Sequence, residues 1–253
     1  MERVICNPVS GKSITITLPE VIARSSGRRG YFGYDPINKQ FKVLCHTYGE
    51  LETNDSQVLT LETGNLIWRR TMECKPHSKG YGEICINGVL YYKAHIDGSS
   101  RMIVCFDFSS EKFSFFKIHE DLVRGTLVNY KGKLGVLGKD KYQLMLWVLE
   151  EDAGLMLWVL EEDAGNHNWC KRISVELKTC DGIVNNLYVV GMTGAGEIVF
   201  SPNSRPNPFY IVYSNIERKA FTRVYIQGFE EFLERRSIFS HIFVDYVENF
   251  KLL

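Results

Sequence analysis

The chain has 253 residues, and its 30 lysine and arginine residues balance its 30 aspartate and glutamate residues, so its formal net charge is zero. A chain without net charge has no overall field that would draw in nucleic acid or an acidic membrane surface, and we expect neither as a partner. No apolar run approaches the ~20 residues that span a bilayer, and the N-terminus lacks the apolar core of a secretory signal. These features predict a protein of the cytoplasm or the nucleus.

Short alternating segments dominate the first part of the chain. In Arg3–Pro19 a strand is followed by an Asn-Pro and Ser-Gly turn and then by a second strand, in which Ile14, Ile16 and Leu18 share one face. The polar stretch Ala23–Gly30 is expected to be a solvated loop. Four further strands with short connections predict an antiparallel meander, with the sequences GYFGYD, QFKVLCHT, QVLTLETG and LIWRRT.

The same pattern of strand, turn and strand returns along the chain. Hairpins are predicted at Asn87-Gly88, at Lys131-Gly132 and around Gly194. The glycines Gly88, Gly132 and Gly194 are 44 and 62 residues apart, and the second gap contains an 11-residue insertion. A period of ~45–50 residues with four short strands is typical of β-propeller blades. The sequence therefore predicts an all-β propeller of about five four-stranded antiparallel blades, as one domain over residues 1–253.

The insertion is a tandem duplication, because LMLWVLEEDAG occurs at Leu144–Gly154 and again at Leu155–Gly165. One blade strand needs one copy. The second copy leads directly into the next strand, so we predict that it holds the blade position. The first copy is then expected to bulge out or to form an extra hairpin that turns at Glu150–Gly154. Further on, Gly228–Arg236 predicts a short helix, and Ser237–Leu253 predicts one or two strands.

Residues for chemistry are few, and we predict a protein that is not an enzyme and has no catalytic, cofactor-binding or metal-binding residues. Cys45 and His46 are neighbours on a predicted strand, so their side chains point to opposite faces and cannot form a nucleophile–base pair. The histidines show no H-x-H or H-x₃-H spacing, which disfavours a zinc site. The glycine-rich segment Gly191–Gly196 lies between strands and is interpreted as a turn, and Trp68 and Trp169 as matched packing residues.

The seven cysteines are scattered, without a C-x-x-C pair. An odd, scattered set of this kind is expected to consist of reduced thiols.

Ten segments in register carry a resemblance to a known family. They are VICNPVSGKSITITLP, GYFGYDPINKQFKVLC, QVLTLETGNLIWR, ICINGVLYY, IVCFDFSSEKFSF, VNYKGKLGVL, LWVLEEDAGNHNW, GMTGAGEIVFSP, FYIVYSNIERKAFTRV and DYVENFKLL. Together they resemble the plant F-box-associated domain, a kelch-like β-propeller that follows an N-terminal F-box. Against the family pattern, we expect this chain to lack the F-box itself and its first blade to be incomplete.

The resemblance implies a non-enzymatic scaffold that captures an unknown substrate protein for a cullin-RING ubiquitin ligase. The F-box docks the ligase adaptor, so the adaptor is expected as a partner only where an F-box is present. No binding residues can be named from the resemblance. Two alternatives stay open: a degenerate gene product without present function, and a propeller glycoside hydrolase, which needs paired inward carboxylates.

Overall fold

The structure of the protein is a computed structural model. It describes residues 2–7, 10–24, 28–47, 55–61, 66–71, 74–96, 100–118, 122–139, 143–150, 168–176, 186–204, 206–215, 218, 220–228, 242 and 244. The described strands fall into two compact units, the first with β1–β10 and the second with β11–β18. In this part of the chain, no helix has the length and apolar character needed to cross a membrane.

The first unit begins with the predicted hairpin. Strands β1 (Glu2–Cys6) and β2 (Ser13–Thr17) pair antiparallel. The predicted alternation is confirmed, because Ile16 and Leu18 are buried whereas Ser13 and Thr17 are exposed. This two-stranded sheet is the described part of the first repeat.

A short helix takes the first two residues of the expected loop at Ala23–Gly30, and a strand takes its last three. Helix α1 spans Glu20–Arg24, and the next strand already begins at Arg28. Ile22 of α1 has no exposed surface and lies in a core cluster with residues of β2, β4 and β5. Burial of this apolar side chain, which lies just before the polar stretch, stabilises the helix, and this tertiary effect is not visible in the local composition.

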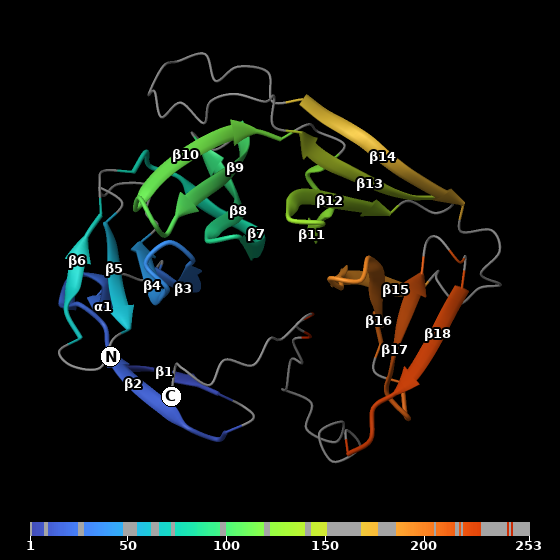
Figure 1. Cartoon of the computed structure of the whole chain (residues 1–253), viewed down its shortest axis with the longest axis horizontal. Coiled ribbons are helices and arrows are strands. Elements are labelled where there is room, and N and C mark those ends of the chain that lie inside the picture. Colours follow the sequence, from blue (N-terminus) through green and yellow to red (C-terminus); the bar gives the residue numbers. More distant parts are fainter. Residues whose placement is uncertain are drawn as a thin grey trace. The chain divides into compact units, whose positions relative to one another are not determined.

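Two four-stranded antiparallel sheets complete the first unit, each with its strands in chain order (Figure 1). One sheet consists of β3 (Arg28–Asp35), β4 (Gln40–Thr47), β5 (Ser56–Leu61) and β6 (Trp68–Arg70). The other consists of β7 (Ser78–Ile86), β8 (Val89–Ile96), β9 (Ser100–Asp107) and β10 (Lys112–Lys117). The predicted meander is confirmed.

The second unit contains two more sheets of the same kind. One consists of β11 (Thr126–Tyr130), β12 (Lys133–Lys139), β13 (Gln143–Glu150) and β14 (Asn168–Glu176). The other consists of β15 (Leu187–Met192), β16 (Glu197–Pro202), β17 (Tyr210–Asn215) and β18 (Ala220–Tyr225). The chain is therefore an all-β protein whose repeated element is a four-stranded antiparallel sheet.

The tight hairpins form where glycine predicts them. Asn87 and Gly88 have φ angles of 50° and 85°, and Lys131 and Gly132 have 52° and 83°. Positive φ at both central residues gives the turn whose twist matches that of paired strands. The glycine-rich segment Gly191–Gly196 contains the predicted turn, because its first two residues end β15 and residues 193–196 connect β15 to β16.

The duplicated segment is placed differently from the prediction. The first copy forms β13, which pairs with β12 from Gly135↔Val148 to Lys139↔Leu144. The second copy, Leu155–Gly165, lies outside the described residues. Only residues 140–142 separate β12 from β13. With so short a connection, the segment that pairs antiparallel with β12 is the first copy. The prediction that the second copy holds the blade strand is wrong.

Apolar side chains pack between neighbouring sheets within each unit. In the first unit Tyr31, Leu44 and Val58 of one sheet meet Tyr92 and Phe106 of the other. In the second unit one cluster joins Val128, Leu137 and Leu146 to Phe200 and Val212. The predicted helix at Gly228–Arg236 falls outside the described residues after Gly228, and the predicted strands at Ser237–Leu253 fall outside them except for Ile242 and Val244.

Candidate functional site

Three turns of the first unit lie against one another, and we call residues 36–39, 87–88 and 108–111 the turn group. They connect β3 to β4, β7 to β8 and β9 to β10. The Phe108 amide donates a hydrogen bond to the Gly88 carbonyl over 3.0 Å. The Ser109 hydroxyl donates to Asp35 over 2.7 Å, and a Cβ at Gly88 would overlap Pro36. The turn group thus joins both four-stranded sheets of the unit.

A buried ion pair on the interior side of the turn group contacts two of its turns. Lys42 of β4 is 4% exposed and Asp35 of β3 is 0% exposed. The Lys42 Nζ atom lies 3.1 Å from Asp35 Oδ2 and 3.0 Å from Glu111 Oε1, and it donates to the Phe108 carbonyl over 2.7 Å. One buried cation therefore links β3 to the connection between β9 and β10.

Asp35 also organises its own turn. Its Oδ1 accepts hydrogen bonds from the amides of Ile37 and Asn38, and its Oδ2 accepts one from the Asn38 side chain. Burial by itself would raise the pKa of Asp35, but the hydrogen bonds from Asn38, Ser109 and Lys42 outweigh burial and hold the pKa well below its usual range. The carboxylate is therefore ionised throughout the physiological pH range.

Apolar side chains are exposed on and beside this rigid support. Ile37, in the first turn, is 76% exposed, and Phe32 and Tyr34 of β3 are 45% and 37% exposed. Both rings lie beside Phe41 of β4, with centroids 5.3 Å and 4.8 Å away. A rigid element that presents exposed apolar side chains is a common feature of protein-binding surfaces.

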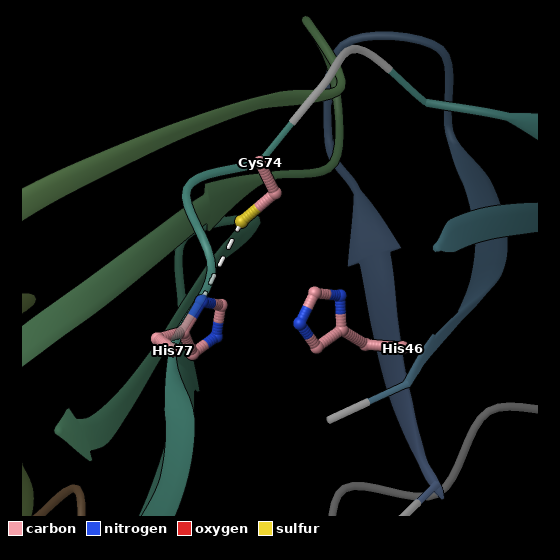
Figure 2. A group of neighbouring side chains, drawn as sticks. All are labelled: His46, Cys74 and His77. Carbon is pink, nitrogen blue, oxygen red and sulfur yellow. Dashed lines mark hydrogen bonds between the residues drawn. The ribbon is translucent and has the colours of Figure 1, made fainter. Parts of the chain in front are cut away.

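The second feature of the first unit is a group of three side chains, His46, Cys74 and His77, which we call the His–Cys cluster. Figure 2 shows the two imidazole rings beside each other with the Cys74 side chain reaching toward them. His46 comes from β4, whereas Cys74 and His77 come from the segment that leads into β7. Their possible ligand atoms all lie within 4.8 Å of one another.

Each histidine of the cluster is held by a hydroxyl group. His46 Nδ1 forms a hydrogen bond with the Ser56 Oγ atom, and His77 Nε2 forms one with the Tyr92 hydroxyl over 2.9 Å. His77 Nδ1 lies 2.8 Å from the Lys75 carbonyl and 3.7 Å from Cys74 Sγ. Since a carbonyl only accepts, Nδ1 carries the proton and Nε2 accepts from Tyr92.

All three groups of the cluster are neutral near pH 7. Burial and the neighbouring His77 lower the pKa of His46 to about 3. Burial also lowers the pKa of His77, and it raises the pKa of the Cys74 thiol to about 12. Neutral imidazoles are competent metal ligands, whereas the thiol has to lose its proton first.

Sequence reasoning located part of this geometry. Cys45 lies in the core cluster that contains α1 and β2, whereas His46 lies beside His77, so the prediction that they point to opposite faces is confirmed. Cys74 and His77 have the C-x₂-H spacing of a local ligand pair, a signal that the search for H-x-H and H-x₃-H passes over. His46 could not be added from sequence, because 27 residues separate it from Cys74.

The remaining predicted residues are placed as follows. Trp68 begins β6, donates to the Thr17 carbonyl over 2.8 Å and packs against a core cluster, so it is a packing residue. Trp169 lies on β14, the matching fourth strand of its sheet. Five cysteines, Cys6, Cys45, Cys74, Cys85 and Cys105, are free thiols in the part of the chain whose side chains the structure describes.

Comparison with known proteins gives a consistent result over nearly the whole chain. Residues 1–247 match the F-box associated beta propeller domain. F-box protein At1g53790 of Arabidopsis thaliana is 42% identical over 99% of this chain and 55% of its own length. F-box protein DOR and F-box protein At5g65850 of the same plant are each 42% identical over 98% and 99% of this chain.

The chain covers 55% of the first of these relatives and 62% of the other two, so more than a third of each relative has no counterpart here. The part that does match carries the repeated four-stranded sheets described above. This chain belongs to the F-box associated β-propeller domain family.

Proposed function

We propose that this chain is the protein-binding domain of an F-box protein and that it captures a substrate protein without catalysing a reaction on it. The observation that carries the proposal is the match to the F-box associated domain over residues 1–247. Relatives that are called F-box proteins, and that share 42% identity with it, support the same role. Such a domain acts in the cytoplasm or the nucleus.

The turn group is the surface that we expect to bind the substrate. Asp35 and Lys42 hold its turns in place from inside the unit, so the exposed side chains above them lose little conformational entropy when a partner binds. Ile37 of the turn group and the neighbouring Tyr34 of β3 supply exposed apolar contact area. A partner with an apolar patch of its own fits this chemistry.

Contact with a ubiquitin ligase belongs to another part of the protein in this proposal. The relatives carry additional length that this chain does not match. We assign binding of a cullin-RING adaptor to an F-box in such a segment and assign substrate binding to the present residues. Because the two binding activities are assigned to different segments, they can be tested separately.

The test is a crosslinking purification of the tagged chain from plant cells, followed by direct binding with the purified partner. The wild-type chain is compared with Ile37→Asp, and Ile67→Asp serves as the matched control, since Ile67 is also an exposed isoleucine at 65% but lies outside the turn group. We expect one protein to bind wild type and Ile67→Asp equally and Ile37→Asp at least tenfold more weakly.

Two outcomes would overturn the proposal. If no protein binds the purified chain, the chain is not a binding domain. If the purified ligase adaptor binds residues 1–253 directly, the assignment of adaptor binding to another segment is wrong. Equal binding by both isoleucine variants would move the binding surface away from the turn group.

A further inference from the structure

We propose that His46, Cys74 and His77 form a binding site for a Zn²⁺ ion that ties the two four-stranded sheets of the first unit together. The site is separate from the turn group and does not depend on the proposed function. One ligand comes from β4 and two come from the segment before β7.

The donor set is the first argument for zinc. Thiolate sulfur and imidazole nitrogen are the ligand types that Zn²⁺ takes in proteins, with bonds of about 2.3 Å to sulfur and 2.0–2.1 Å to nitrogen. Three protein ligands leave one tetrahedral position for a water molecule. Hard oxygen-seeking cations such as Mg²⁺ and Ca²⁺ do not fit a site of two nitrogen atoms and one sulfur atom.

The distances form the second argument. Tetrahedral angles and the bond lengths above place sulfur and nitrogen ligands about 3.6 Å apart. Cys74 Sγ and His77 Nδ1 are already 3.7 Å apart. The widest separation in the cluster is within 4.8 Å, so about 1 Å of side-chain movement closes the site around the ion. The His46 and His77 rings are now stacked with centroids 4.7 Å apart, so the movement that zinc binding requires includes a turn of the His46 ring out of this stack.

The outer hydrogen bonds form the third argument. Metal-binding histidines hold the metal with one ring nitrogen and donate a hydrogen bond with the other. Ser56 Oγ contacts Nδ1 of His46, and the Tyr92 hydroxyl contacts Nε2 of His77. This arrangement directs His46 Nε2 and His77 Nδ1 to the ion. The rings of Phe113 and Phe115, with centroids 5.9 Å and 5.8 Å from His46 and His77, supply an apolar wall.

Proton balance follows from these contacts. Zinc binding replaces the thiol proton of Cys74, which leaves to solvent. The proton on His77 Nδ1, now donated to the Lys75 carbonyl, moves to Nε2 and is donated to the Tyr92 hydroxyl. In the zinc-bound form His46 carries its proton on Nδ1 and donates it to Ser56 Oγ.

The test uses the full chain after removal of metal with a chelator. Zn²⁺ is titrated against a chromophoric competitor, and metal content is measured after dialysis. We expect one zinc ion per chain, and we expect Cys74→Ser and His46→Gln each to weaken binding by at least tenfold. The matched controls Cys6→Ser and His95→Gln lie outside the cluster and should bind zinc as wild type does. Co²⁺ in place of zinc should show a thiolate charge-transfer band that Cys74→Ser removes.

A second variant keeps the test decisive if removal of a ligand prevents folding. Tyr92→Phe preserves the ring and its packing but removes the hydroxyl beside His77, and we expect it to weaken zinc binding by about 10- to 100-fold. Absence of stoichiometric zinc in the folded wild-type chain would overturn the proposal. Binding that the cluster variants leave unchanged would also overturn it, since the zinc would then lie elsewhere.

Discussion

Lys42 and Asp35 form an ion pair in the interior of the first unit, with 3.1 Å between Lys42 Nζ and Asp35 Oδ2. Glu111 adds a second carboxylate at 3.0 Å from Lys42, and Arg69 lies 2.9 Å from Glu111 at the surface. Removing one member of a buried ion pair leaves the other charge desolvated without compensation, and this costs more than the pair itself contributes.

We therefore expect Lys42→Met to lower the free energy of unfolding by about 3 kcal/mol, because Asp35 loses its cation. Urea denaturation followed by circular dichroism measures the change. Lys117→Met is the matched control, since Lys117 is exposed on β10, and exposed substitutions change stability by about 0.5 kcal/mol or less. Equal effects of the two variants would contradict a structural role for the ion pair.

Asp35 also predicts how stability depends on pH. Its pKa is held below that of the unfolded chain, so the unfolded state binds more protons in acid and stability falls as the pH falls. The contribution is complete above about pH 5 and decreases toward the folded-state pKa, by about 2–3 kcal/mol in total. Denaturation midpoints between pH 7 and pH 2 should fall more steeply for wild type than for Asp35→Asn. Parallel curves would show that Asp35 does not carry the effect.

At the scale of elements, close contact between the sheets of the first unit depends on a glycine. A Cβ at Gly33 of β3 would overlap the ring of Phe108, which has no exposed surface, whereas one at Gly30 of the same strand would make an ordinary 3.5 Å contact with Cys45 Sγ.

We expect Gly33→Ala to destabilise the protein by about 1–3 kcal/mol through overpacking. Gly30→Ala is the matched control on the same strand and should have a small effect. Thermal unfolding of the two variants separates overpacking from the shared change in backbone entropy. A control as unstable as Gly33→Ala would remove the contact with Phe108 as the cause.

The duplicated segment offers a second matched pair. Leu146 of the first copy is 1% exposed and belongs to the core cluster of the second unit, and Leu157 is the equivalent residue of the second copy. Because the first copy forms β13, we expect Leu146→Ala to cost about 2–5 kcal/mol of unfolding free energy. Leu157→Ala should cost clearly less. The reverse order would assign the strand to the second copy after all.

At the scale of the whole molecule, balanced charge has a consequence for solubility. The sequence isoelectric point is about 7.0, and proteins near zero net charge associate and precipitate most readily. We expect the solubility of the purified chain to have its minimum near pH 7 and to rise on both sides. Turbidity across pH 5.5–8.5 measures this, and a monotonic curve would contradict it.

The sequence by itself determined the repeated strands, their antiparallel order, the hairpin turns and the family, because alternation, glycine and asparagine act over a few residues. Tertiary structure decided what depends on contacts between distant segments. Burial of Ile22 extended a short helix two residues into the stretch Ala23–Gly30 that was predicted to be a loop. The short connection after β12 places the first of the two identical copies in strand β13. Local sequence preferences cannot distinguish two copies with the same sequence. Packing of β4 against the segment before β7 brought His46 to Cys74 and His77, since only the fold sets distances between residues so far apart in the chain.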